Sequence, residues 1–328
     1  MDTSKITIGV IGLGMMGSSI AVSLLLSGHP IIAIAPIKGE KEKANLHIRK
    51  LFRYCDKSGL LSKSIPAYLS SLHITEDFYE LKSCELIIEC VVENREIKRQ
   101  VYERVEKIVS RDAIIATNTS AIPISILQQD LTFPERFIGI HWAEPAYGTR
   151  FMEIVNGSNS LPLYANWVYE LAHEWDKEPT LLKKDIRGFI TNRLMYAAFR
   201  EAFFLEKCGI TTFEDVDKAM RYDAGSWMTF MGLFERMDYI GLDDFKVIFE
   251  AVFPDLHNGD GVPEIMEYLV NKEARGTQDG MGVYQYTKEE AESWEESFAK
   301  FNKDIYRLAT EFLEERNYSE NEFLERNK

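Results

Sequence analysis

One histidine and one glutamate have the types and the spacing that proton transfer requires. His141 follows the apolar run 137–140, which predicts a strand, and Glu153 lies twelve residues later, beyond a turn with Pro145 and Gly148. An imidazole whose second nitrogen bonds a carboxylate keeps one tautomer and becomes more basic, which suits it to take a proton from a hydroxyl group. A histidine at a strand end is more often structural, so the pair alone does not establish this chemistry.

Two further polar residues could bind the oxygen of a substrate. Ser120 ends the segment 117–120, which follows the predicted strand 113–116, and Asn192 lies near the start of a long amphipathic segment. The carboxyl ends of strands face the ligand crevice in open α/β sheets, so polar residues there often contact ligand. In the company of Ser120 and Asn192, the histidine is better explained as a catalytic residue.

The N-terminal segment has the pattern of a dinucleotide-binding turn. The apolar run 6–11 predicts a buried strand, which breaks into Gly12, Gly14 and Gly17 at the spacing Gly-x-Gly-x-x-Gly, and a helix follows that ends at Gly28. In such a unit the first glycine permits the turn, the second admits a pyrophosphate, and the third lets the helix pack on the strand. We expect a dinucleotide site here, the alternative being a purely structural turn.

The position that should hold the ribose differs from the usual pattern. The next predicted strand, 31–35, should end in Asp or Glu to bind the 2′-hydroxyl of NAD, but it ends in Ala35. Three lysines follow it: Lys38, Lys41 and Lys43. These could tolerate a 2′-phosphate, which leaves NADP as an alternative. We favour NAD because no arginine stands at the strand end.

Composition excludes several classes of protein. The 328 residues carry a net charge of −14, which argues against nucleic acid as a partner, and no apolar run approaches the length of about twenty residues that a membrane span needs. The first strand begins directly after Lys5, which leaves no room for a signal peptide. The four cysteines form no Cys-x-x-Cys pair, so we expect a reducing, cytoplasmic setting and no structural metal.

One segment is basic despite the acidic total. Residues 38–63 contain eight basic and three acidic side chains, a local charge of +5. Such a segment could bind the phosphates of a nucleotide-tailed substrate such as an acyl-CoA. An ordinary solvated helix face is an equally good explanation.

The succession of patterns predicts two domains. Strands and helices alternate to about residue 183, which predicts a doubly wound, Rossmann-type α/β domain over residues 1–184. The rest is mostly helical: residues 189–205 form an amphipathic helix that Gly209 ends, and residues 211–215 begin another. We therefore expect an all-α C-terminal domain over residues 185–328.

Nearly the whole chain resembles the 3-hydroxyacyl-CoA dehydrogenase family. The resemblance is carried by six blocks in the family's order: residues 12–17, residues 89–94, residues 117–120, His141 with Pro145 and Glu153, residues 188–193, and residues 231–235 with Asp238 and residues 241–243. Residues 280–284 resemble the family's closing glycine-aromatic turn. Six ordered blocks are far more specific than any one of them.

The resemblance implies NAD-dependent oxidation of a 3-hydroxyacyl group to the 3-oxo form, and the reverse reduction. His141 would be the general base, and Glu153 would orient it and balance its charge. Ser120 and Asn192 would hydrogen-bond the oxygen that gains negative character. The helical domain would take part in substrate binding and mediate a homodimer.

The resemblance also extends the set of candidate cofactor-binding residues. Glu93 and Lys98 fall where the family places residues near the cofactor ribose and nicotinamide. Met16 and Asn118 stand in the matching blocks, and Ala35 occupies the ribose position. We count all five with the three glycines.

Three departures from the family pattern bear on the cofactor or on the substrate. Ala35 replaces the Asp that binds the cofactor ribose in the family. Glu144 stands where the family has Asn, and its carboxylate could make His141 more basic or repel an acidic substrate. Residues 226–230 lengthen the segment before Met231. This longer segment resembles the one in a branch of the family that comprises the L-gulonate and carnitine dehydrogenases and lambda-crystallin.

Three functions therefore stay open from the sequence. We expect a 3-hydroxyacyl-CoA dehydrogenase, because of the ordered blocks and the basic segment 38–63. The alternative is a dehydrogenase of a small free 3-hydroxy acid, similar to gulonate, carnitine or hydroxybutyrate. The third possibility is a non-catalytic dinucleotide-binding protein. The presence of His141, Glu153, Ser120 and Asn192 argues against it.

Overall fold

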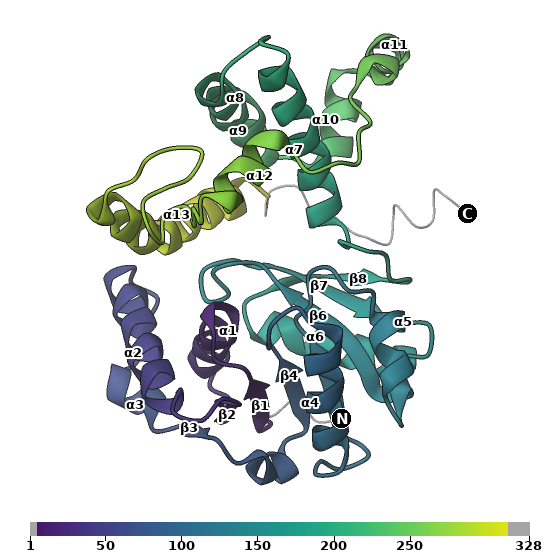
Figure 1. Cartoon of the computed structure of the whole chain (residues 1–328). Helices are drawn as coiled ribbons and strands as arrows, with labels where there is room; N and C mark the ends of the chain where they lie inside the picture. The colour runs from purple at the N-terminus through teal and green to yellow at the C-terminus, as the bar shows by residue number, and fades with distance from the viewer. Residues whose placement is uncertain (1–4, 314–328) are drawn as a thin grey trace. The chain divides into compact units, whose positions relative to one another are not determined.

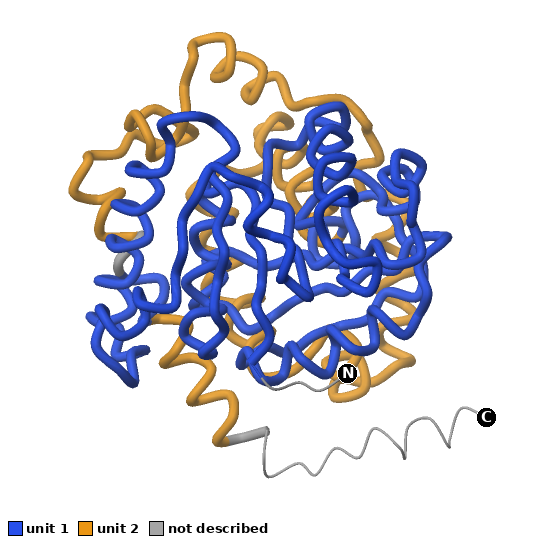
Figure 2. The backbone as a smooth tube through the Cα atoms, turned by 90° about the horizontal axis from the view of Figure 1, so that it is seen from below, with its two compact units in different colours: residues 1–193, 296–300 blue, residues 194–295, 301–328 orange. Residues whose placement is uncertain are grey.

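The chain folds into one unit built on a sheet and a second built from helices. The computed structural model describes residues 5–313. The first compact unit comprises Met1–Arg193 with Glu296–Lys300, and the second comprises Leu194–Glu295 with Phe301–Lys328 (Figure 2). The predicted fold class, a Rossmann-type α/β domain followed by a helical one, is confirmed. The predicted domain boundary near residue 184 stays a prediction.

The first unit contains a sheet of eight strands within the described residues. The strands are β1 (Ile8–Ile11), β2 (Ile31–Ile34), β3 (Leu72–Thr75), β4 (Leu86–Glu89), β5 (Ile114–Thr117), β6 (Phe137–Trp142), β7 (Phe151–Asn156) and β8 (Glu178–Leu182). Their order is β3-β2-β1-β4-β5-β6-β7-β8, and every neighbouring pair is parallel except β6 and β7. Strands β2 and β3 are added on one side of β1, and β4 and β5 on the other. At such a reversal of strand order, ligands bind in the crevice outside the carboxyl ends of the two central strands, here β1 and β4.

Helices cover both faces of this sheet (Figure 1). They are α1 (Met15–Leu26), α2 (Lys41–Lys57), α3 (Ile65–Leu69), α4 (Arg95–Glu106), α5 (Ile124–Leu127) and α6 (Pro162–Glu174). In β5, Ile114 and Ala116 join the core under α1, α2, α3 and α6, whereas Ile115 joins the core under α4 and α5. Burial on both faces explains why the strand sequences are almost continuously apolar.

The second unit is helical, as expected from the sequence. Its helices, the first and last of which extend across the unit boundary, are α7 (Thr191–Lys207), α8 (Phe213–Ala219), α9 (Gly225–Met228), α10 (Leu233–Ile240), α11 (Leu242–Val252), α12 (Glu264–Asn271) and α13 (Lys288–Leu313). Gly209, at φ +68°, follows α7, and the Thr212 hydroxyl caps α8 by accepting from the amide of Asp215. Across residues 5–313, no helix combines the length and apolarity needed to cross a membrane.

A buried histidine ties the start of β1 to the end of α6. His29 Nδ1 lies 3.1 Å from the carbonyl oxygen of Ile6, and the indole nitrogen of Trp175 donates to His29 Nε2 at 3.0 Å. Since Nε2 accepts, Nδ1 carries the hydrogen and the ring is neutral. Burial lowers the pKa of His29, although the carbonyl of Ile6 and the charge of Glu174 oppose it.

Protonation of His29 is expected to weaken folding in mild acid. Well above the ordinary pKa of 6.5 the ring is neutral in both states, so it adds no pH dependence. Below that pH the unfolded chain takes up a proton that the folded chain resists, so the free energy of unfolding falls. Urea unfolding at pH 7.5 and 5.5 should show a drop about 1 kcal/mol larger in the wild type than in His29→Gln. Equal drops would show that the His29 ring does not remain neutral in the fold.

Candidate active site

The antiparallel pairing of β6 and β7 places His141 directly opposite Glu153. The two residues are partners in the strand register, and His141 Nδ1 lies 2.6 Å from Glu153 Oε2. The Glu153 side chain is fully buried, whereas 12% of the His141 side chain is exposed. Because a carboxylate only accepts, Nδ1 carries the hydrogen in the neutral ring and Nε2 presents its lone pair.

The other carboxylate oxygen of Glu153 binds the start of α7. Its Oε1 accepts hydrogen bonds from the amides of Ile190, at 2.7 Å, and Thr191, at 3.2 Å. A left-handed turn at Gly188 and Phe189 delivers these amides, and the Phe189 ring packs against the His141 ring at 5.4 Å between centroids. Burial alone raises the pKa of Glu153, but the bond from His141 and the two amides outweigh it, so the pKa lies below its ordinary value. The carboxylate is therefore an anion.

Two more predicted site residues lie beside the imidazole. Ser120 Oγ lies 3.1 Å from His141 Nε2, and the Asn192 amide donates to the carbonyl oxygen of Ser120 at 3.4 Å. Ser120 is exposed and Asn192 is half-buried. The structure thus brings together His141, Glu153, Ser120 and Asn192 from separate parts of the sequence. At the carboxyl end of the sheet, the unprotonated Nε2 of His141 accepts from the Ser120 hydroxyl, and Asn192 bonds the backbone of Ser120.

The turn after β1 fits the phosphates of a dinucleotide. A Cβ at Gly17 would lie 1.8 Å from the carbonyl oxygen of Gly12, so this glycine is required for helix-to-strand packing. Nothing lies within 4 Å of a Cβ built at Gly14, which is the N-cap of α1. The first turn of α1 carries no acidic side chain, so its amide end is free to face an anion.

The remaining cofactor candidates lie in different surroundings. Met16 is half-buried against the core that contains α1, and Ala35 is buried directly after β2. The Asn118 side-chain oxygen accepts from the amide of Trp142 at 2.9 Å, which joins the ends of β5 and β6. Glu144, the departure near His141, is exposed. Whether these side chains contact a cofactor or a substrate stays a prediction.

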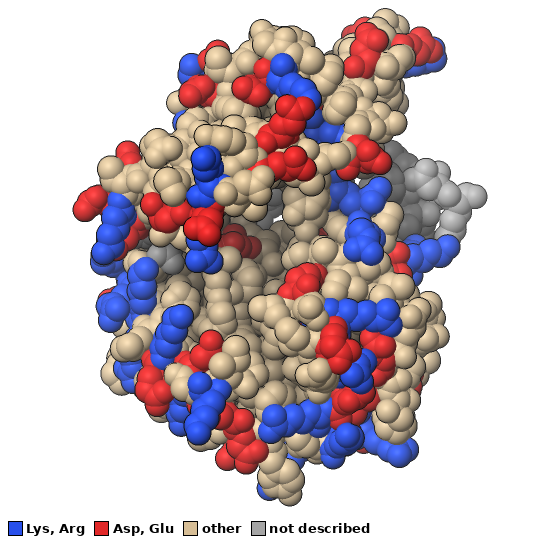
Figure 3. Space-filling view, in the orientation of Figure 1, with Lys and Arg blue, Asp and Glu red and all other residues tan. Residues whose placement is uncertain are grey.

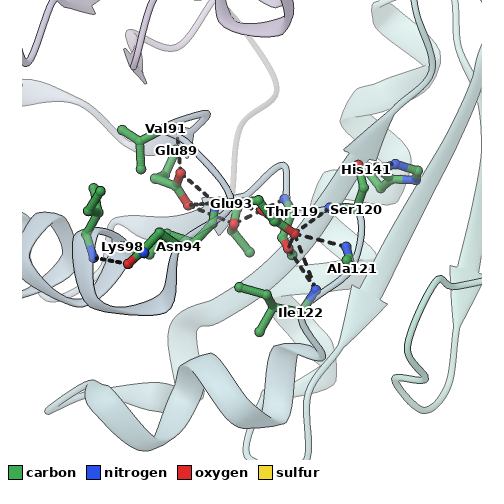
Figure 4. A network of polar contacts seen from close by, with 12 residues as sticks. Glu89, Val91, Glu93, Asn94, Lys98, Thr119, Ser120, Ala121, Ile122 and His141 are labelled. Atoms are coloured by element: carbon green, nitrogen blue, oxygen red, sulfur yellow. Dashed lines mark hydrogen bonds and ion pairs between the residues drawn. The ribbon is translucent and has the colours of Figure 1, made fainter. Parts of the chain in front are cut away.

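Lys98 and Glu93 take part in a polar network inside the first unit (Figure 4). The Lys98 ammonium is buried and bonds both oxygens of Glu89, at 2.8 and 3.0 Å, and it lies 3.4 Å from Glu93 Oε2. Burial raises the pKa of Glu93, but the Thr119 hydroxyl, the charge of Lys98 and the amide of Ala121 together hold it below its ordinary value. Both side chains therefore have strong protein partners.

The sequence analysis assigned no role to Glu89, although this residue anchors the network. Glu89 is fully buried at the end of β4 and accepts from the hydroxyls of Tyr102, at 2.6 Å, and Thr117, at 2.8 Å. The sequence did contain a signal for this role: Glu89 stands inside the continuous apolar run 86–92, which predicts a buried strand. A buried carboxylate requires hydrogen-bond and ionic partners. Those partners themselves come from other elements.

Most of the basic segment 38–63 lies in α2. Five of its cationic side chains are exposed on this helix: Lys41, Lys43, Arg49, Arg53 and Lys57. The opposite side of the helix, with Ile48 and Phe52, is buried in the core. Figure 3 shows basic side chains over the α2 region, interspersed with acidic ones.

Comparison with known proteins gives matches over most of the chain. The model of the 3-hydroxyacyl-CoA dehydrogenase NAD binding domain matches residues 7–186, and that of the 3-hydroxyacyl-CoA dehydrogenase C-terminal domain matches residues 188–286. Hydroxyacyl-coenzyme A dehydrogenase of Sus scrofa mitochondria is 31% identical over an alignment of 288 residues that covers 84% of this chain and 90% of that protein.

A relative named for a different substrate is also similar. The 5-formyl-3-hydroxy-2-methylpyridine 4-carboxylate 5-dehydrogenase of Mesorhizobium japonicum is 31% identical over an alignment of 289 residues that covers 87% of this chain and 92% of that protein. A solved structure of an enzyme of this activity, described as an NAD⁺-dependent dismutase, has a TM-score of 0.85 at 29% identity and covers 92% of this chain and 98% of its own. These matches confirm NAD as the cofactor, and the chain belongs to the 3-hydroxyacyl-CoA dehydrogenase family.

Proposed function

We propose that this protein oxidises the hydroxyl group of a 3-hydroxyacyl-CoA to the 3-oxo form with NAD, and catalyses the reverse reduction. The observation that carries the proposal is the His141–Glu153 pair, in which the unprotonated Nε2 of His141 lies 3.1 Å from the Ser120 hydroxyl at the carboxyl end of the sheet. A neutral imidazole backed by a buried carboxylate is the arrangement that a general base for an alcohol needs.

In this proposal His141 accepts and returns the proton, and Glu153 stabilises the positive charge of the protonated ring. Nε2 takes the hydroxyl proton of the substrate during oxidation, and the imidazolium that results is stabilised by the Glu153 carboxylate at 2.6 Å. When the reaction runs as a reduction, the imidazolium returns that proton to the oxygen. Glu153 keeps the ring in one orientation because its other oxygen is fixed by two backbone amides.

Ser120 and Asn192 serve the oxygen of the substrate. The Ser120 hydroxyl can donate to an alkoxide-like oxygen held near His141 Nε2, and the Asn192 amide, now 3.4 Å from the Ser120 carbonyl, can donate to the same oxygen. NAD, when bound, supplies the acceptor for the hydride that leaves the carbon atom bearing this oxygen. The protein supplies orientation and proton transfer.

The dinucleotide would be held at the turn after β1. Gly12 and Gly17 shape the turn, and Gly14 leaves open space at the amide end of α1 for the pyrophosphate. Met16, Ala35, Asn118 and Lys98 complete the proposed set of cofactor-binding residues. Glu93, the fifth candidate from the family resemblance, bonds the turn after β5.

Two glycine-to-alanine variants separate cofactor binding from folding. Gly17→Ala should lower the free energy of unfolding by about 2 kcal/mol or more, because its Cβ collides with the carbonyl of Gly12. Gly14→Ala should leave stability within about 0.5 kcal/mol of the wild type but weaken NAD binding about tenfold, since the methyl group enters the open space. Urea unfolding and NAD titration by fluorescence measure both. Normal NAD affinity in Gly14→Ala would place the pyrophosphate elsewhere.

The exposed cations of α2 support a CoA thioester as the substrate. The segment has local charge +5 in a chain of net charge −14, and Lys41, Lys43, Arg49 and Arg53 are solvent-exposed on α2, where cations can bind phosphates. The second candidate is a small free acid that carries a hydroxyl or aldehyde group. It is favoured by the similarity to the pyridine-carboxylate dehydrogenase, whose structure has a TM-score of 0.85.

A substrate panel with charge-reversal variants distinguishes the two candidates. If α2 binds the phosphates of CoA, Lys41→Glu with Arg49→Glu should raise KM for 3-hydroxybutyryl-CoA about tenfold and leave KM for 3-hydroxybutyryl-pantetheine unchanged. Lys107→Glu, an exposed lysine that follows α4, is the matched control. A preference of about tenfold or more for 3-hydroxybutyrate, gulonate, carnitine or the pyridine carboxylate over the thioester would contradict the CoA proposal.

We also infer that the partner of this chain is a second copy of itself. In helices α7, α8, α10, α11 and α12 no described residue is buried, and large apolar side chains such as Phe234 and Val247 are exposed. A homodimer through the helical unit, as the family resemblance implies, would cover such surface. Light scattering of the protein in solution should give twice the mass of one chain, and the mass of a single chain would contradict the homodimer. A cytoplasmic setting without nucleic acid as a partner remains part of the proposal.

A further inference from the structure

Four hydrogen-bond donors of the turn after β5 converge on one carboxylate oxygen. Glu93 Oε1 accepts from the amides of Ser120, at 3.2 Å, Ala121, at 3.0 Å, and Ile122, at 3.4 Å, and from the hydroxyl of Thr119 (Figure 4). Consecutive amides that point to one place form a site for an anion. Here the anion is a side chain from the segment after β4.

The rest of the network holds Glu93 in this position. Asn94 caps α4 by accepting from the amides of Glu96 and Ile97, and this fixes the backbone next to Glu93. On its other side, Glu93 Oε2 lies 3.4 Å from the ammonium of Lys98. A carboxylate held between a buried cation and a ring of amides has little freedom to move.

Lys98 is itself held by a second carboxylate. Its ammonium bonds both oxygens of Glu89, which also accepts from the hydroxyl of Thr117 at 2.8 Å. The Thr117 oxygen in turn accepts from the amide of Thr119 at 3.2 Å. Glu89 and Glu93 therefore hold the two ends of the same turn, and Lys98 lies between them.

The residue carried by this turn is Ser120. Its backbone amide is bound to Glu93, and its hydroxyl lies 3.1 Å from His141 Nε2. Since Ser120 is exposed, packing contributes little to its position and the hydrogen bonds of the turn determine it. Glu93 thus acts on Ser120 through the backbone, without touching His141.

We propose that Glu93 is a positioning residue: its carboxylate, anchored by Lys98, orders the turn 119–122 and so holds the Ser120 hydroxyl beside His141. This inference rests on the proposed function of Ser120 and His141. It differs from the role that the family resemblance implies for Glu93, a contact to the cofactor ribose. The two roles give different kinetics.

A double-mutant cycle separates the two roles. Glu93→Gln keeps the size of the side chain but removes its charge, and charge-assisted hydrogen bonds are about twice as strong as neutral ones. We expect kcat to fall about tenfold, with the Kd of NAD unchanged, because the loss acts through Ser120. In a Ser120→Ala background the same change should cost less than about twofold, since the hydroxyl that Glu93 positions is absent.

The contrary results are equally defined. An additive loss in the Ser120→Ala background, or a loss that appears in the Kd of NAD, would overturn the proposal and assign Glu93 to the cofactor. Glu96→Gln is the matched control, because Glu96 lies on the same stretch but bonds Arg99 and Gln100 of its own helix and not the turn 119–122. Its kcat should equal that of the wild type. If Glu93→Gln fails to fold, Thr119→Val removes one donor to the same oxygen and should give a smaller loss of the same non-additive kind.

A readout without turnover makes the test independent of the substrate. The imidazole nitrogen shifts of His141, identified by their loss in His141→Gln, report the Ser120 hydrogen bond in ¹⁵N NMR spectra of the whole protein. Glu93→Gln should move them toward their values in Ser120→Ala, and Glu96→Gln should leave them unchanged. Wild-type shifts in Glu93→Gln would overturn the positioning role even if no substrate had been found. Shifts that move in a protein inactive on every substrate would instead leave positioning intact and refute the proposed function.

Discussion

The hydrogen bond between His141 and Glu153 is the constraint on which the site depends. It forms because β7 runs antiparallel to β6, so that two residues far apart along the chain face each other across one strand pair. The same carboxylate binds the first amides of α7, which brings Asn192 to the site. A single buried anion thus orients the base and fixes the start of the helix that supplies another polar group.

The first unit uses a buried carboxylate in the same way on two strands of the sheet, β4 and β7. Glu89 ends β4 and Glu153 lies in β7, and both side chains are fully buried. Burying a charge is costly unless the charge is paired or hydrogen-bonded. The Lys98 ammonium pairs with Glu89, whereas the His141 ring and two backbone amides hydrogen-bond Glu153. In both cases the carboxylate organises chain segments that carry site residues. The polar groups at this edge of the sheet are therefore part of the architecture that positions Ser120 and His141.

The sequence was informative where a residue type leaves few alternatives. Glycines 12, 14 and 17 predicted the strand, turn and helix, and the turn between His141 and Glu153 allowed the pair that the structure brings together. The Glu93 contacts left no such signal, because three of its four donors to Oε1 are backbone amides, which every non-proline residue has. Exposed lysines on α2 likewise cannot distinguish phosphate binding from solvation, so the choice of substrate did not follow from the sequence.

The central claim is that one imidazole transfers the proton while the rest of the site holds it in place. Steady-state turnover of His141→Gln with the best substrate of the wild type tests this most directly, with the Kd of NAD and the unfolding midpoint measured on the same preparation. We expect kcat to fall by about a hundredfold or more, while the other two values stay near those of the wild type. A kcat within about threefold of the wild type would contradict it.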